Sequence, residues 1–528
     1  MRRGAREGLR PLALLALLPA GLFAQEPKPA PVIDTVIVVN HNIFATEDKA
    51  PGFLETVING LHRTTRARVI RRTILLEPGM LYDSAKVVES ERLLRSLGVF
   101  RDVRFDTLRV DGRLALRVTT GDGWSTSLNL GYSTTAGSVS WLVSATERNL
   151  LGTATALSVA LHHNPDRDNL SFLYQNAAFI GRRTGLNLEY DDLSDGRRGL
   201  WSYGQGFYQS AAQFAVMDSG EAAHNRVLMF KDDQLSAAYQ RKALISTNTL
   251  GWAPLATSRD YLRLTFSSVW RREDYQDTVF DLQPFPRDFY ASFGVAAERA
   301  HVRYSQIEHF NSFGRYEDLD LSQIVGVGVW VAPNSWGYGP RAGLAPQAHF
   351  QVSTVWRGGF AEVRGQALGM FTRSGLDSGR VTSALTAVTT DLPSQTLIFH
   401  FEGGAVTRTA PGGEFDLWRD GNGPRLFGAH VLTGSRMFWL AVDDRITIAS
   451  EVWSLFGLGV APFFDYGGAW YSIEPARTST DAGVALRLGP TRSIGGDVIE
   501  LAVGYRSGAG VIPGKHWAAT LGTGIFYH

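Results

Sequence analysis

The sequence contains no cysteine, which excludes a disulfide-stapled fold and a zinc site built on thiolates. It also has no charge excess: 52 basic residues face 51 acidic ones, and a net charge of +1 gives no electrostatic footprint for nucleic acid. Beyond residue 25 there is no run of about 18 apolar residues, which excludes a bundle of membrane helices. A transmembrane β-barrel stays open, because its apolar residues alternate with polar ones. With 44% hydrophobic residues and 56 glycines, the 528-residue chain is not disordered.

The N-terminus differs from the rest of the chain. Four arginines precede an apolar run at residues 12–23, and Ala24 stands before the polar Gln25. A charged region, a short apolar region and a small residue before the cleavage site are typical of a signal peptide. The apolar run of about 12 residues is too short to cross a bilayer at about 1.5 Å per residue. We therefore expect residues 1–24 to be a signal peptide and the protein to be exported.

Residues 25–121 carry mixed patterns. Alternation around residues 33–38, 100–107 and 114–118 predicts three strands, the last two joined by an Asp111-Gly112 turn. Residues 85–98 have apolar side chains at helical spacing, and Gly98 stands where a left-handed C-cap is needed. The sequence therefore predicts a small α+β domain.

From Trp124 to the end, short alternating segments follow one another with turn residues between them. Segments 127–133, 157–163, 262–267 and 484–489 each place apolar residues on one face and small or polar residues on the other. With an export signal and no convincing helix, this pattern predicts a mostly β protein. We expect a transmembrane antiparallel β-barrel of about 16 strands over residues 122–528, at about 25 residues per strand and connection. The number of strands within 215–400 is left open. Alternation also directs Asp443 and Arg445 inward.

Specific segments carry a family resemblance. RVIRR (68–72), LLEPG (75–79) and LLRSLGVFRDV (93–103) resemble a POTRA domain, the periplasmic module of the BamA/TamA superfamily. ERNLLGT (147–153) is similar to that superfamily's second-strand motif. One POTRA domain fits residues 25–121, and residues 44–61 look like an insertion in it. The resemblance implies a bacterial outer-membrane barrel with its POTRA domain in the periplasm.

Two further segments resemble the superfamily's loop motif and its partner strand. GPRLFG (423–428) stands where a long loop enters the barrel lumen, and FFDYG (463–467) stands where a strand receives it. The residues implied are Arg425, Phe427, Gly428, Phe463, Asp465 and Gly467. A guanidinium in a lumen needs a fixed carboxylate, so we expect an Arg425–Asp465 pair. Leu426 departs from the family, which has glycine there.

The last segment is similar to the C-terminal signal of outer-membrane barrels, carried by Thr520, Gly522, Ile525 and Tyr527. We expect a last strand over 515–527 that pairs with a first strand over 124–134 and closes the barrel. Glycines 514, 522 and 524 are expected to weaken this seam. Alternation predicts that Trp517, Leu521, Ile525 and Tyr527 face lipid.

The resemblance implies a factor that inserts β-barrel proteins or translocates polypeptides, through strand addition at the POTRA edge and at the lateral seam. Its partners would be unfolded outer-membrane or secreted polypeptides, the lipid bilayer, and periplasmic chaperones or lipoproteins, with no nucleic acid. A polypeptide-secretion pore and a passive channel remain alternatives. A surface enzyme is disfavoured, because the adjacent His162 and His163 point to opposite faces of a strand and no catalytic motif occurs. We expect no catalytic residue, metal or cofactor.

Overall fold

The computed structural model describes residues 31–43, 60, 62–135, 138–277, 288–308, 310–313, 316–333, 342–418, 423–453, 455–492, 498–524 and 527. The expected signal peptide, most of the expected insertion at 44–61, and Ile525 lie outside these residues.

A small α+β unit comes first in the chain. Its sheet has the order β1-β3-β2, with β1 (Ile33–His41) parallel to β3 (Arg113–Asp122) and β2 (Phe100–Val110) antiparallel to β3. Two helices, α2 (Ala67–Thr73) and α3 (Ser84–Ser96), pack on it. One buried cluster of this unit consists of Val69, Ile70, Ile74, Leu94, Val99, Phe100 and Val118, joined by Ala154 from a barrel turn, and a second consists of Ile33, Leu76, Val87 and Leu116.

Local chemistry sets the ends of these elements. The Asp83 carboxylate caps α3 by accepting a hydrogen bond from the Ala85 amide at 2.9 Å. Gly98 follows the helix with a φ of +63°, the left-handed conformation expected of its C-cap. Asp111 and Gly112 both have positive φ, as a two-residue turn between β2 and β3 requires.

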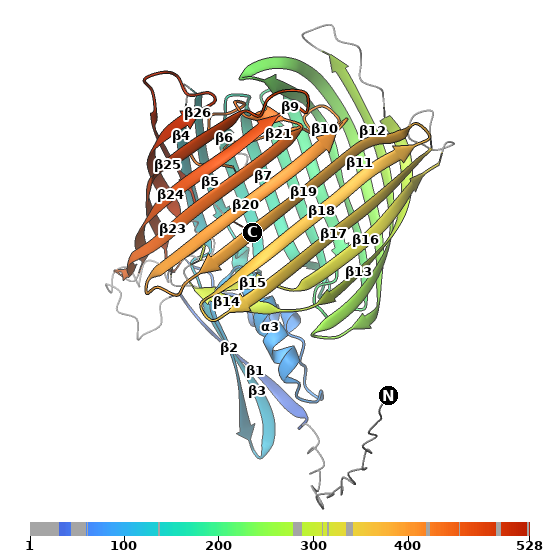
Figure 1. Cartoon of the computed structure of the whole chain (residues 1–528). Coiled ribbons are helices and arrows are strands. Elements are labelled where there is room, and N and C mark those ends of the chain that lie inside the picture. Colours follow the sequence, from blue (N-terminus) through green and yellow to red (C-terminus); the bar gives the residue numbers. More distant parts are fainter. Residues whose placement is uncertain are drawn as a thin grey trace, which may run out of the picture.

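The rest of the described chain forms a barrel in which each strand pairs antiparallel with its neighbours (Figure 1). Among the described residues it closes from 20 strands, so the expected number of about 16 was wrong. The estimate assumed connections that are too long, since the turns at 232–233, 357–358 and 373–374 each use two residues. The strands are β4 (Thr126–Thr135), β5 (Ser138–Glu147), β6 (Thr155–His163), β7 (Asp168–Ile180), β8 (Thr184–Leu193), β9 (Gly196–Gln205), β10 (Phe214–Lys231), β11 (Gln234–Ala256), β12 (Asp260–Asp277), β13 (Asp288–His301), β16 (Gln323–Ala332), β17 (Gly343–Trp356), β18 (Gly359–Thr372), β19 (Gly375–Thr389), β20 (Gln395–Thr407), β23 (Arg436–Val452), β24 (Phe456–Trp470), β25 (Thr478–Pro490), β26 (Ile499–Gly508) and β27 (Trp517–Thr523).

On the barrel wall, the apolar residues of the alternating segments face outward, as predicted. Leu128, Leu130 and Tyr132 of β4 are exposed on the outer face, as are Val484, Leu486 and Leu488 of β25. Many inward positions are small, polar or charged, while Phe360, Ile398 and Trp439 are buried on the same side. Asp443 and Arg445 are buried in the lumen as predicted. No helix in the described part of the chain is both long and apolar enough to cross a membrane.

Two long connections fold back into the barrel from opposite ends. The first, residues 408–435 between β20 and β23, is called the lumen loop here and includes the short strands β21 (Phe415–Asp416) and β22 (Thr433–Gly434). The second lies between β13 and β16 at the end that carries the small domain (Figure 1). It consists of β14 (Tyr304–Glu308), β15 (Tyr316–Asp320) and residues 310–313 between them, and is called the inner hairpin.

Candidate functional site

Arg425, at the tip of the lumen loop, has a side chain with no exposed surface. Its Nη2 donates to the Asp443 carboxylate at 2.9 Å and its Nε donates to the Glu500 carboxylate at 3.3 Å. The expected partner, Asp465, lies 4.0 Å from Nη1 and accepts from the Arg425 amide at 3.4 Å. The structure therefore brings Arg425 and Asp465 together, but Asp443 makes the shorter ion pair.

The ion pairs around Arg425 extend along the lumen wall. Arg445 donates from Nε to the Asp443 carboxylate at 2.9 Å, and Arg487 donates from Nε to the Glu500 carboxylate at 3.0 Å. Asp443 and Glu500 therefore each bridge Arg425 to a second arginine. Buried charges lose their hydration, and only close partners on several sides compensate that cost. This network holds the tip of the lumen loop in one position.

The backbone beside Arg425 is also held by the wall. The Leu426 amide donates to the Asp481 carboxylate at 2.9 Å, and the Leu426 carbonyl accepts from Arg506 Nη1 at 3.1 Å. Sequence reasoning missed Asp481, Glu500 and Arg506. The available signal was the series of charged residues at inward positions of β24, β25 and β26, which a barrel places around one part of the lumen.

Leu426 replaces the family's glycine without backbone strain, because its φ is not positive. Its side chain is fully buried against small and aromatic residues of the wall, and a Cβ on Gly504 would lie 2.9 Å from Leu426 Cδ1. The pocket is formed by Ala461, Phe463, Ala485 and Ala502. Small residues on three strands therefore accommodate the larger side chain.

The remaining expected loop residues lie in the same region. The Arg425 guanidinium lies over the Phe463 ring, 4.8 Å from its centroid. Phe427 is buried among Leu417, Leu432 and Met437, and a Cβ on Gly467 would come within 3.3 Å of its ring. Gly428 is buried beside them.

His430 attaches the lumen loop to the barrel rim. It lies 2.6 Å from the Asp416 carboxylate through Nδ1 and 2.9 Å from the Asp166 carboxylate through Nε2. Its ring stacks on Phe230, with centroids 3.7 Å apart. Burial by itself would lower the pKa of His430, but the hydrogen bonds with Asp166 and Asp416 outweigh burial and raise the pKa to about 9.

The seam between the first and last strands is short. The pairing of β27 with β4 covers only residues 132–134 of β4, whereas the pairing of β4 with β5 covers residues 126–135. Thr520 and Gly522 face the lumen side and are buried, and Trp517 is 70% exposed on the outer face as expected. Gly514 lies in the connection before β27, with a φ of +81°, and not in the last strand as predicted.

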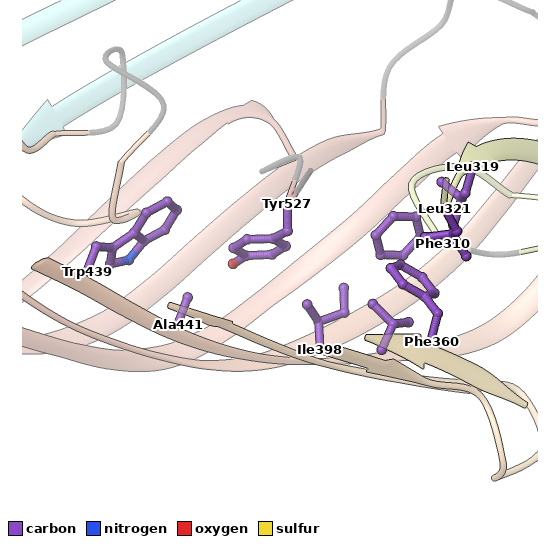
Figure 2. Close-up of a cluster of buried hydrophobic side chains, with 9 residues drawn as sticks. Phe310, Leu319, Leu321, Phe360, Ile398, Trp439, Ala441 and Tyr527 are labelled. Carbon is purple, nitrogen blue, oxygen red and sulfur yellow. The ribbon is translucent and has the colours of Figure 1, made fainter. Parts of the chain in front are cut away.

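The chain leaves the barrel wall after β27. Gly524 donates its amide to the Val498 carbonyl at 2.8 Å, and its Cα faces the Glu500 carboxylate, which a Cβ would approach to 3.0 Å. Tyr527 is 1% exposed and lies in the lumen with Trp439 and Phe310 (Figure 2). Its hydroxyl accepts from Arg425 Nη1 at 3.1 Å. The prediction that Tyr527 faces lipid was wrong, because strand alternation stops applying where the strand ends at Thr523.

No family model matches the chain. The chain is 28% identical over 159 residues to the outer membrane protein assembly factor BamA of Neorickettsia risticii (strain Illinois). That match covers 29% of this chain and 21% of the relative, so it spans about a fifth of the relative's length. Among solved structures, BamA from Haemophilus ducreyi lacking POTRA domains 1-3 is 15% identical with a TM-score of 0.39, covering 92% of this chain and 84% of that one. CdiB from Escherichia coli is 10% identical with a TM-score of 0.48, covering 97% and 93%.

The closed antiparallel barrel and its alternating wall define an outer-membrane β-barrel. The sequence match to a BamA agrees with the resemblance read from the motifs, and over the matched residues the chain is similar to the BamA/TamA superfamily.

Proposed function

We propose that this protein inserts β-barrel polypeptides into the outer membrane through a seam between β4 and β27 that opens sideways. The observation that carries the proposal is the seam itself, where register pairing covers only residues 132–134 of β4. Within the described residues, residues 126–131 of β4 pair with β5 on one side, and the register pairing with β27 (Trp517–Thr523) does not cover them on the other. Unpaired backbone groups are costly in a lipid environment, so an incoming strand that satisfies them is stabilised there.

The inturned tail supports the same proposal. Tyr527 lies in the lumen and not along the wall, so its side chain takes no part in the seam. Arg425 donates hydrogen bonds both to Tyr527 and to Asp443 of the network that holds the lumen loop. The charge network around Arg425 therefore also holds the tail in the lumen. In this proposal, Arg425, Phe427, Gly428, Phe463, Asp465 and Gly467 position the loop. Thr520 and Gly522 belong to the seam strand, and Gly524 and Tyr527 belong to the tail that turns into the lumen.

The contents of the lumen favour insertion over a passive channel. The lumen loop and the inner hairpin enter from opposite ends, and both Leu426 and Phe310 are fully buried. A cavity of about 510 Å³ lies along the wall, lined by strand residues that include Glu298, Glu362, Arg364, His400 and Glu402. A secretion pore would have to displace both segments to pass a polypeptide. Lateral opening requires only that the short seam separate.

The small α+β unit is proposed as a POTRA domain over residues 25–121, placed in the periplasm, with the barrel over 122–528 and a signal peptide over 1–24. Its sheet order leaves β1 and β2 at the two edges. An edge strand offers unpaired backbone groups to an extended client, or to a periplasmic chaperone or lipoprotein.

A disulfide across the seam tests the proposal, because the chain has no cysteine of its own. Ser133 and Thr520 are register partners, so Ser133→Cys with Thr520→Cys should lock β4 to β27. The matched control, Ser144→Cys with Ala160→Cys, joins the register partners of β5 and β6. The assay follows insertion of a denatured outer-membrane barrel into liposomes that contain each variant.

We expect the oxidised seam variant to lose its ability to accelerate insertion of the denatured barrel and to regain it on reduction. The control variant should accelerate insertion in both states. Equal activity of the oxidised and reduced seam variants would contradict a lateral seam. Translocation of a soluble polypeptide through the oxidised variant would instead favour the secretion pore.

A further inference from the structure

The inner hairpin is built to occupy the lumen at one defined place. At its base, Arg95 of α3 donates to the Asp318 carboxylate from Nε at 2.6 Å and from Nη2 at 3.0 Å. Arg92 of α3 lies over the Tyr304 ring, 4.4 Å from its centroid. At its tip, the Glu317 carboxylate accepts from the Asn311 and Ser312 amides at 2.8 and 2.9 Å. The hairpin is thus shaped by its own residues and attached to the small domain.

The tip presents two phenylalanines to the lumen wall. Phe310 meets Phe360 edge-on, with centroids 5.8 Å apart, and its carbonyl accepts from Arg445 Nη1. It belongs to the same buried cluster as Tyr527 (Figure 2). Phe313 is 1% exposed and lies under the Arg487 guanidinium, 5.5 Å from its ring centroid.

The wall beneath Phe313 is made of glycine. Gly457 and Gly459 of β24 and Gly489 of β25 lie against the Phe313 ring. A Cβ on Gly457 would overlap Phe313, which supplies all three of its nearest atoms, and a Cβ on Gly489 would lie 2.8 Å from the ring. None of the three glycines has a positive φ, so their backbone conformation does not call for glycine. What the missing side chains provide is room for an aromatic ring.

We propose that Gly457, Gly459 and Gly489, with Arg487 above them, form a binding site for an aromatic side chain of a polypeptide client. The inner hairpin is the resident occupant of this site, and Phe313 is the group that fills it. The inference rests on the proposed function, since it names the part of the client that the lumen receives. The site lies on β24 and β25, and β26 alone separates β25 from the seam strand β27.

The contacts that hold the inner hairpin are consistent with its displacement from the glycine-lined site by a client. The base is held by one ion pair, Arg95–Asp318, whose side chains are 18% and 17% exposed, and by the contact of Arg92 with the Tyr304 ring. The tip, by contrast, is buried, and Phe313 contacts all three glycines of the site. A movement of α3 would withdraw the base of the hairpin and leave the glycine-lined wall open to another aromatic side chain.

The test uses a fluorescent synthetic peptide with the sequence of residues 304–320 and the full chain in detergent. In one variant a Gly-Ser linker replaces residues 304–320, which empties the site. We expect this variant to bind the peptide at least tenfold more tightly than the wild type, measured by fluorescence anisotropy. A peptide carrying Phe310→Ala and Phe313→Ala should bind at least tenfold more weakly than the unaltered peptide.

Two substitutions in the linker variant separate the site from general lumen binding. Gly457→Ala should weaken peptide binding at least tenfold, because its Cβ takes the place of the ring. Gly403→Ala on the outer face of β20 controls for the effect of an added methyl group on the barrel, since its Cβ would meet nothing closer than 3.7 Å, and it should leave binding unchanged. Equal binding by the two glycine variants, or by the two peptides, would overturn the proposal.

A second measurement keeps the proposal testable if the linker variant does not fold. Phe313→Ala in the otherwise intact chain vacates only the ring position. N-acetyl-phenylalanine amide should raise the thermal midpoint of this variant, but not that of the wild type or of Phe313→Ala with Gly457→Ala. No shift in Phe313→Ala, or equal shifts in all three proteins, would overturn the site. Neither assay involves client insertion, so each can fail while the lateral seam stands.

Discussion

Nη1 of Arg425 donates a hydrogen bond to the hydroxyl of Tyr527 at 3.1 Å, and both side chains are buried in the lumen. The tip of the lumen loop and the end of the chain are therefore parts of one site. The motifs around Arg425 and around Thr520 suggest two separate devices, one holding the loop and one marking the seam. The Arg425–Tyr527 hydrogen bond links the lumen loop to the tail, so a substitution in one should alter the position of the other.

Tyr527→Phe isolates this contact. The ring keeps its packing against Trp439 and His400, while a hydrogen bond to a charged group, worth about 1.5–3 kcal/mol, is lost. We expect the tail to leave the lumen more often and a Thr523→Cys reporter to react with a maleimide several-fold faster than in the parent chain. A Ser158→Cys reporter on β6 should react at the same rate in both. An unchanged rate at position 523 would show that the hydroxyl does not retain the tail.

Arg425→Ala should be among the most destabilising single changes in the barrel. It leaves the Asp443 and Glu500 carboxylates buried with fewer partners, and breaking a buried ion pair costs about 3–5 kcal/mol. The temperature at which the folded band disappears in semi-native electrophoresis should fall markedly. Arg299→Ala is the control, because its side chain is 52% exposed and its ion pair with Asp260 spans 3.7 Å. Similar melting of the two variants would contradict a structural role for the network.

Leu426→Gly would restore the family's residue and should nevertheless destabilise this protein. The side chain fills a pocket against Ala461, Ala485 and Ala502, and emptying a buried leucine site costs about 2–5 kcal/mol. Its amide and carbonyl bonds to Asp481 and Arg506 remain in the variant. Chemical unfolding in detergent should show the loss, with Leu426→Ala falling between the two. A glycine variant as stable as the parent would mean that the pocket collapses without cost.

The attachment of the lumen loop through His430 should depend on pH. The folded-state pKa of about 9 lies above the ordinary value of 6.5, so the stabilisation is fully present below pH 6.5 and is lost as the pH rises through 9. The effect is at most about 3 kcal/mol. Protease cleavage within residues 408–435 should accelerate between pH 6.5 and 10 after correction for the protease's own profile.

His430→Gln serves as the control for this pH dependence. Its cleavage rate should be higher at pH 6 and flat across the same range, because glutamine carries no titratable charge. A wild-type rate that does not change with pH would remove His430 as the titrating group.

Features that depend on neighbouring residues along the chain could be predicted. Alternation identified the outward faces of β4 and β25 and the inward positions of Asp443 and Arg445, because side chains of a strand alternate whatever the strand pairs with. Gly98 and the Asp111-Gly112 turn set element ends through local backbone chemistry. The loop motif brought Arg425 and Asp465 to attention together, and the two residues do lie together.

The sequence by itself thus determined the mostly β architecture, the small α+β unit and the inward direction of Asp443 and Arg445. Only the tertiary structure decided the closure of the barrel from 20 strands among the described residues, the choice of Asp443 and Glu500 as partners of Arg425, and the inward turn of Tyr527. Which carboxylates surround one guanidinium depends on the register between strands that are far apart in the chain, such as β23 and β26. The side of the wall on which Tyr527 lies depends on where β27 stops pairing, which is a property of the closed barrel and not of the last residues alone.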